Sequence, residues 1–91
     1  MEVIEYRAFE DCWKLKKVNI PEGCEKIKEW AFYDCERLKK VIIPESVEVI
    51  GDYAFCDCKL AEITIKKPES KRYISSTAFL DCRDVEEETG N

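Results

Sequence analysis

The chain is built from one short phrase that returns at a nearly fixed interval. Ala-Phe-x-Asp-Cys occurs four times, at Ala8–Cys12, Ala31–Cys35, Ala54–Cys58 and Ala78–Cys82. Successive copies are 23, 23 and 24 residues apart, and an isoleucine stands four residues before each alanine. A period in this range is typical of solenoid proteins, in which each repeat packs only on its neighbours. The sequence therefore predicts a stack of about four coils.

Each repeat reads as one short helix and one short strand. The i, i+4 spacing of Ile27 and Ala31, followed by Phe32, predicts the helix. The run Val41–Ile43 before a proline predicts the strand. We therefore expect an α/β repeat solenoid, with one helix and one strand in each repeat of about 23 residues. The whole chain, 1–91, is expected to be a single domain with repeats at about 1–23, 24–46, 47–70 and 71–91.

Composition and net charge argue against some classes of function. Of the 91 residues, 45% are hydrophobic, which predicts a folded chain, and the net charge is −5 with no histidine. A direct nucleic-acid binder needs a basic surface, so that class is not expected. The N-terminal sequence resembles no signal peptide, and no run of 18 apolar residues predicts a membrane span. The sequence as given predicts a cytoplasmic protein, or a surface or secreted one if a leader was removed.

Cysteines occupy repeat positions. The chain has six, and Cys12, Cys35, Cys58 and Cys82 hold the same slot of successive repeats. Stacking places these four in a column beside Ala and Phe, where a buried reduced thiol is expected. Disulfides between neighbouring coils stay open as an alternative, because adjacent strands approach within bridging distance.

The long pattern Ile-x-x-x-Ala-Phe-x-x-Cys-x-x-Leu-x-x-Val-x-Ile-Pro-x-x-Val is fullest at Ile27–Val47. Ile50–Phe55 adds Ile-Gly-Asp-Tyr-Ala-Phe. This pattern resembles the BspA-type leucine-rich repeat, and the resemblance covers essentially the entire chain. It implies a short right-handed solenoid with a strand on one side and a short helix on the other. It also implies an adhesion or interaction protein of the surface or secreted kind.

The strand side supplies the first candidate site. Side chains alternate along a strand, so Val41 and Ile43 are expected to point inward and their neighbours outward. The outward residues of three stacked strands form the predicted partner-binding face: Lys17, Asn19, Lys40, Ile42, Glu62 and Thr64. An apolar Ile42 flanked by lysines suits a small recognition patch, while an ordinary solvated sheet face is the alternative.

Two further surfaces stand out. Trp30 and Tyr53 hold the same slot before Ala-Phe, which predicts an aromatic second candidate face. An acidic column is expected at the turns, from Glu22, Glu45 and Glu69, with a solvated turn as the alternative.

Reactive chemistry is not indicated. The aspartates that precede the four column cysteines are expected to bond turn backbone rather than act as paired carboxylates. Cys56 is expected to be partly exposed and is the best candidate for a reactive thiol. No histidine is present and no ligand set completes a metal site. We expect no metal, no cofactor and no enzymatic activity.

The predicted function is therefore a non-catalytic module that binds a protein partner through its strand face. One alternative is a small acidic intracellular inhibitor, such as a phage-encoded anti-defence or anti-CRISPR-type protein, that binds a basic nucleic-acid-handling protein. Another is a structural fragment or designed minimal repeat array. The apolar N-terminal end predicts either a homodimer through that end or a cut edge, and Glu86–Glu88 predict a polar C-terminal cap.

Overall fold

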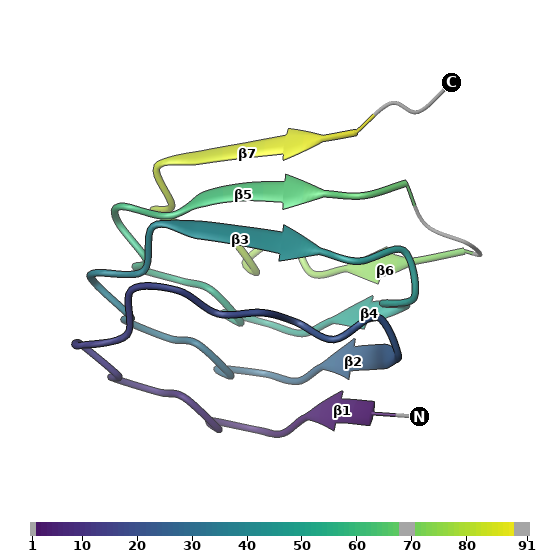
Figure 1. The fold of residues 1–91 in the computed structure, drawn as a ribbon. Helices are drawn as coiled ribbons and strands as arrows, with labels where there is room; N and C mark the ends of the chain where they lie inside the picture. Colours follow the sequence, from purple (N-terminus) through teal and green to yellow (C-terminus); the bar gives the residue numbers. More distant parts are fainter. Residues whose placement is uncertain (1, 68–70, 89–91) are drawn as a thin grey trace.

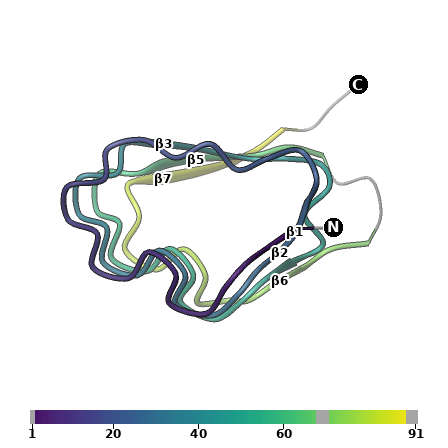
Figure 2. The same ribbon diagram turned by 60° about the horizontal axis from the view of Figure 1, so that its bottom comes forward.

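The computed structural model describes residues 2–67 and 71–88, which form a solenoid of four stacked coils (Figure 1). Two parallel sheets run along the stack. One contains β1 (Glu2–Ile4), β2 (Cys24–Ile27), β4 (Val49–Ile50) and β6 (Tyr73–Ile74), in that order. The other contains β3 (Lys40–Ile43), β5 (Glu62–Ile65) and β7 (Asp84–Glu87). Viewed close to the solenoid axis, the coils superpose and the two sheets line opposite sides (Figure 2).

The repeat sets the register of both sheets. The isoleucine that opens each repeat pairs with its counterpart, Ile4 with Ile27, Ile27 with Ile50 and Ile50 with Ile74. Each of these isoleucines ends a strand, so the second to fourth coils carry two strands where one was predicted. In the first coil the predicted strand around Val18 is reduced to a single bridge between Lys17 and Lys40. Asn19 is a poor strand former, and this segment is paired on one side only.

The predicted helix of each repeat is wrong, because the described residues contain no helix. The Ala-Phe segment is instead a series of tight turns. In the second coil, the N–H groups of Trp30, Phe32 and Asp34 donate to carbonyls of the third coil at 3.0, 2.7 and 2.8 Å. The alternate N–H groups of Ala31 and Tyr33 donate three residues back, to carbonyls of their own coil. Every second backbone N–H group of this segment therefore joins one coil to the next, which a helix would prevent.

Left-handed backbone residues produce this alternation. Positive φ angles, between 58° and 63°, recur at the residue before Ala-Phe and at the aspartate before the column cysteine: Arg7, Asp11, Trp30, Asp34, Tyr53, Asp57 and Asp81. A left-handed residue cannot continue a right-handed helix. Aspartate tolerates this conformation, whereas a bulky residue such as Trp30 is uncommon there.

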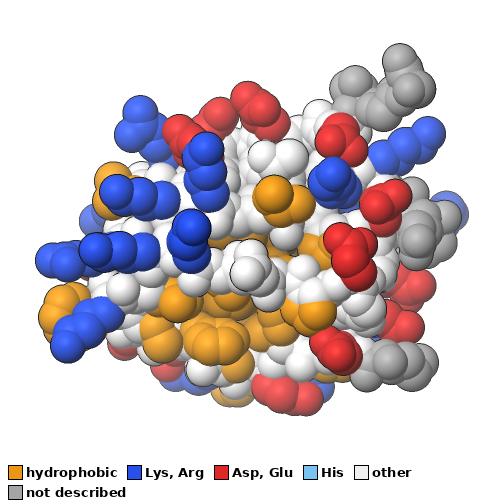
Figure 3. Space-filling view, in the orientation of Figure 1, with side chains coloured by type: hydrophobic (Ala, Val, Ile, Leu, Met, Phe, Trp, Pro, Cys, Tyr) orange, Lys and Arg blue, Asp and Glu red, His pale blue; other side chains and the backbone are white. Residues whose placement is uncertain are grey.

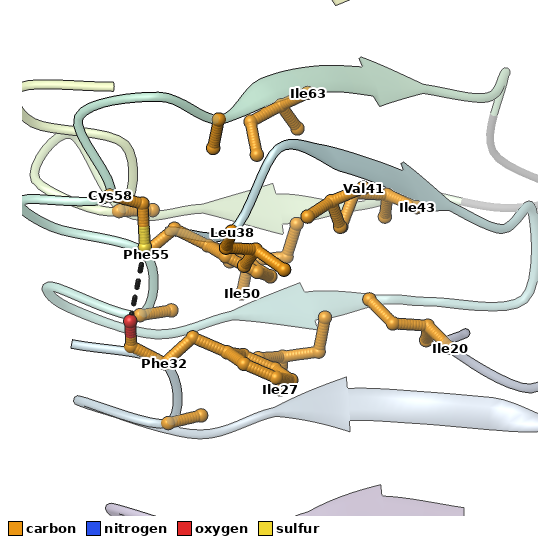
Figure 4. Packing of buried hydrophobic residues seen from close by; sticks show 14 of the residues in the cluster. Ile20, Ile27, Phe32, Leu38, Val41, Ile43, Ile50, Phe55, Cys58 and Ile63 are labelled. Carbon is orange, nitrogen blue, oxygen red and sulfur yellow. Dashed lines mark hydrogen bonds between the residues drawn. The ribbon is translucent and has the colours of Figure 1, made fainter. Parts of the chain in front are cut away.

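The core is a set of side-chain columns that run along the solenoid axis. Four phenylalanines stack face to face with ring centroids 5.0, 4.8 and 5.5 Å apart: Phe9, Phe32, Phe55 and Phe79. The inward-facing isoleucines and valines of both sheets pack against this column. In the two middle coils they are almost completely buried: Ile27, Val41, Ile43, Ile50 and Ile63 (Figure 4).

The column cysteines tie neighbouring coils together. The thiols of Cys35, Cys58 and Cys82 each donate to the carbonyl oxygen of the phenylalanine in the preceding coil, at 3.1 Å. Figure 4 shows this bond for Cys58 and Phe32. All six cysteines are free, so the predicted column of reduced thiols is present. Cys12 and Cys82 are less buried because they lie on the two end coils.

A half-buried arginine, Arg72, forms hydrogen bonds to the turns that follow β3 and β5. The Arg72 guanidinium donates to three carbonyl oxygens, those of Val47 at 2.6 Å, Pro44 at 2.8 Å and Lys66 at 2.9 Å. Burial lowers the pKa of Arg72 from its ordinary value. The side chain therefore joins two successive turns, the one at Pro44–Val47 and its own between β5 and β6, through charge-assisted hydrogen bonds.

Candidate functional site

The β3–β5–β7 sheet exposes one face of alternating side chains. In β3 the valine and the second isoleucine, Val41 and Ile43, are buried, while Lys40 and Ile42 are exposed. The same alternation continues in β5, where Glu62 and Thr64 lie on the outer face. This face is the surface on which the predicted partner-binding residues were expected.

Strand register places the predicted residues in two columns. Lys40 pairs with Glu62 and Ile42 with Thr64, and the bridge of Lys17 to Lys40 brings the first coil into the same column. The structure adds β7 to the face, because Asp84 pairs with Glu62 and Glu86 pairs with Thr64.

Ile42 lies between two hollows of about 340 Å³ each and lines both of them. Lys17, Asn19 and Lys40 line the first hollow, and Lys40, Glu62 and Thr64 line the second. The Ile42 side chain is 54% exposed although its neighbours along the strand are buried. An exposed apolar residue between two hollows offers a contact that a partner side chain can cover.

The second candidate face is a stack of side chains. The rings of Trp30 and Tyr53 are 4.6 Å apart with an interplanar angle of 28°. The Arg7 guanidinium lies 5.4 Å from the Trp30 ring and extends the stack into the first coil. Both rings are half-buried, so much of their surface already packs against neighbouring side chains. Their role in binding stays a prediction.

The acidic column is only partly described. Glu22 and Glu45 are exposed at the turns that follow the strand positions of the first two coils. Glu22 also lines the first hollow, beside Ile20 and Pro44. Glu69 lies outside the described residues.

Cys56 is not the exposed thiol that was expected. The residue is only 7% exposed, so its thiol is buried. Burial, followed by the charges of Asp57 and Asp81, raises the pKa of Cys56 to about 11. A thiol with a raised pKa stays protonated near neutral pH and is a poor nucleophile, so Cys56 is not placed for reactive chemistry.

Within residues 2–67 and 71–88, no group of three or more Cys, Asp or Glu side chains could hold a metal ion. In the same part of the chain, no helix is long and apolar enough to cross a bilayer.

Sequence reasoning missed two parts of the face. The acidic run near the C-terminus was expected to be a polar cap, and the sequence did not predict that Asp84–Glu87 also form β7, the edge strand that extends the sheet with exposed carboxylates. A group of seven exposed cations, here called the basic corner, lies where the chain enters β3, β5 and the equivalent first-coil segment: Lys14, Lys16, Lys17, Arg37, Lys39, Lys40 and Lys59. The repeat register alone would have shown that these cations gather from three coils.

Figure 3 shows both signs of charge on this side of the molecule. Lys and Arg side chains gather at the left, where β3 and β5 begin, and acidic side chains lie at the right and the top. Apolar side chains gather at the lower end, over the first coil. There Val3 and Phe9 are 38% and 37% exposed, and self-association through this end stays a prediction.

Comparison with known proteins agrees with the architecture. The BspA type leucine-rich repeat region matches residues 2–89 in six copies. No curated protein and no solved structure matches the chain. The match spans nearly the full sequence, and the four stacked coils with parallel sheets are those of a leucine-rich-repeat solenoid. The chain belongs to the BspA-type leucine-rich-repeat family.

Proposed function

We propose that the chain is a non-catalytic protein-binding module and that its β3–β5–β7 face contacts the partner. The observation that carries the proposal is the exposed Ile42 between two hollows, whose linings together contain all six predicted residues. Leucine-rich-repeat proteins commonly mediate protein interactions, and solenoids offer extended faces for this purpose.

The chemistry of the face supports recognition of a protein surface. Ile42 supplies an apolar contact, while Lys40 and Glu62 beside it supply opposite charges that select a partner. The hollows are partly open to solvent, which suits side chains of a protein better than a small molecule enclosed on most sides. The inhibitor and minimal-array alternatives stay predictions.

The test compares two charge insertions at exposed apolar positions. Ile42→Glu alters the proposed face, and Tyr73→Glu is the matched control, because Tyr73 is 62% exposed on the opposite sheet. Each purified, immobilised protein is exposed to lysate of the source organism, and captured proteins are quantified by mass spectrometry. Circular dichroism and urea unfolding confirm that both variants fold.

We expect at least one protein to be captured by the wild type and by Tyr73→Glu, and to be lost with Ile42→Glu. Capture that is equal for all three proteins would show that the β3–β5–β7 face is not the contact surface. Loss with both variants would point to a general charge effect and would contradict the proposal as well.

A further inference from the structure

The basic corner is an unusual feature for an acidic protein. Seven of the chain's 15 Lys and Arg residues lie there, although the net charge is −5. All seven side chains are exposed. Among the described residues, the ion pairs involve Arg7, Lys28, Lys66 and Arg83, and none involves a cation of the basic corner.

The fold brings these cations into neighbouring positions. Lys17 and Lys40 form a parallel bridge, and the Lys39 N–H donates to the Lys16 carbonyl at 3.1 Å. Two lysine columns therefore run side by side across the first two coils. Like charges directly opposite each other in a sheet are unfavourable, and a bound anionic group would remove that repulsion.

Apolar and aromatic surface lies among the cations. Trp13 is 54% exposed, with the Lys14 Nζ 5.1 Å and the Arg37 Cζ 5.5 Å from its ring centroid. Leu60 is 43% exposed and lines a hollow of about 280 Å³, whose other described lining residues are Lys39, Lys40, Glu62 and Arg83. The basic corner thus combines cations held over an aromatic ring with a hollow in which Leu60 is the one apolar side chain among the described, otherwise charged, lining residues. This combination matches a ligand that carries both carboxylates and an apolar side chain.

We propose that the basic corner binds an acidic segment of a partner protein, with an apolar residue of that segment entering the hollow beside Leu60. This inference rests on the proposed function and names the partner chemistry for one end of the same face. Acidic groups border the corner at Glu62 and Asp84, which favours a short protein segment over a long phosphate backbone that would cross them.

The probe is a fluorescein-labelled peptide, Glu-Glu-Asp-Leu-Glu-Trp-Glu-Glu, whose binding is followed by fluorescence anisotropy at 50 and 300 mM NaCl. The comparison peptide has glutamine or asparagine at every acidic position. A labelled 12-mer of deoxythymidine tests nucleic acid. Lys16→Gln/Arg37→Gln/Lys39→Gln removes three cations of the corner, and Lys26→Gln/Lys67→Gln/Lys71→Gln removes three exposed lysines elsewhere.

We expect the acidic peptide to bind, to bind more weakly at 300 mM NaCl, and to lose about tenfold in affinity with the corner variant but not with the control variant. Absence of binding would overturn the proposal, as would equal binding of the neutral peptide or equal loss with both variants. Tighter binding of the oligonucleotide would also overturn it, because nucleic acid would then be the ligand.

This experiment can fail independently of the proposed function. The lysate comparison depends on Ile42, whereas the peptide comparison changes only Lys16, Arg37 and Lys39. If the peptide does not bind while Ile42→Glu still abolishes capture, the binding module stands and only its acidic partner is wrong. If Ile42→Glu leaves capture intact while the peptide binds as expected, the basic corner binds its acidic ligand and the proposed contact around Ile42 is wrong.

Discussion

Replacing Arg72 by methionine should destabilise the solenoid by about 2–3 kcal/mol. The guanidinium donates to the carbonyls of Val47, Pro44 and Lys66, and each such bond contributes roughly 1 kcal/mol net in a folded protein. Methionine has a similar length but no donor, so all three bonds are lost. Because the site is only half-buried, water reaches part of the freed carbonyl surface, which keeps the expected loss below the upper range for cationic hydrogen bonds.

The assay is urea unfolding followed by circular dichroism and tryptophan fluorescence, with coincident transitions as the check for two-state behaviour. For a chain of this size, a loss of 2 kcal/mol lowers Tm by about 8–16 °C. Arg72→Lys keeps the charge but cannot reach three acceptors at once, so its stability should be intermediate.

Arg83→Met is the matched control. Arg83 forms an ion pair with Glu62 at 3.6 Å between side chains that are 64% and 48% exposed, and its removal should change stability by no more than about 0.5 kcal/mol. If Arg72→Met lowered the free energy of unfolding no more than the control, or if Arg72→Lys were as stable as the wild type, the hydrogen bonds of Arg72 to the three carbonyls would not be a source of stability.

Three other predictions concern packing and protonation. A Cβ at Gly51 would lie 2.8 Å from the Glu29 backbone nitrogen, so Gly51→Ala should lower the free energy of unfolding in urea by about 1–3 kcal/mol. Gly23→Ala is the control, because a Cβ there meets no atom within 4 Å and should not destabilise the protein. Cys58→Ala removes a buried thiol and its bond to a neighbouring coil, and should cost about 2 kcal/mol; a change below 0.5 kcal/mol would contradict the thiol column. Because the folded state raises the pKa of Cys56 to about 11, the native protein retains a proton that the unfolded chain releases, and stability should fall as pH rises from about 8.5 towards 11. Urea midpoints at pH 7.5 and 10 under reducing conditions measure this, and Cys56→Ala should reduce the drop; an unchanged drop would assign it to other groups.

The sequence predicts the coil number and the inward and outward faces of the strands, because both follow from periodicity. Val41 and Ile43 had to be buried together, and stacking at a fixed interval had to align them with the next coil. The prediction of a helix was wrong because the four-residue spacing of Ile27 and Ala31 does not come from helical periodicity. Ile27 ends a strand, and Ala31 follows a left-handed residue in a turn.

The side-chain environment of single positions was harder to predict. Aspartate before each column cysteine could have indicated left-handed backbone, but Trp30 at such a position gives no such signal. The exposure of Cys56 depends on how one turn packs, which the repeat pattern does not determine. Stacking of the strands predicted that Lys17 and Lys40 lie together, and a bridge joins them. The rest of the basic corner was missed because Lys14, Arg37 and Lys59 lie in turns outside the strands, on three different coils.

The charge on the β3–β5–β7 face changes sign along the solenoid. One column passes from Lys17 and Lys40 to Glu62 and Asp84, and it runs parallel to the stacking direction. The two ends of the face therefore carry opposite charge. An extended partner whose own charge changes sign along its length would align in one orientation, since the reverse orientation would place like charges together. The order of the repeats, as well as their number, would then determine the orientation in which a partner binds along the solenoid.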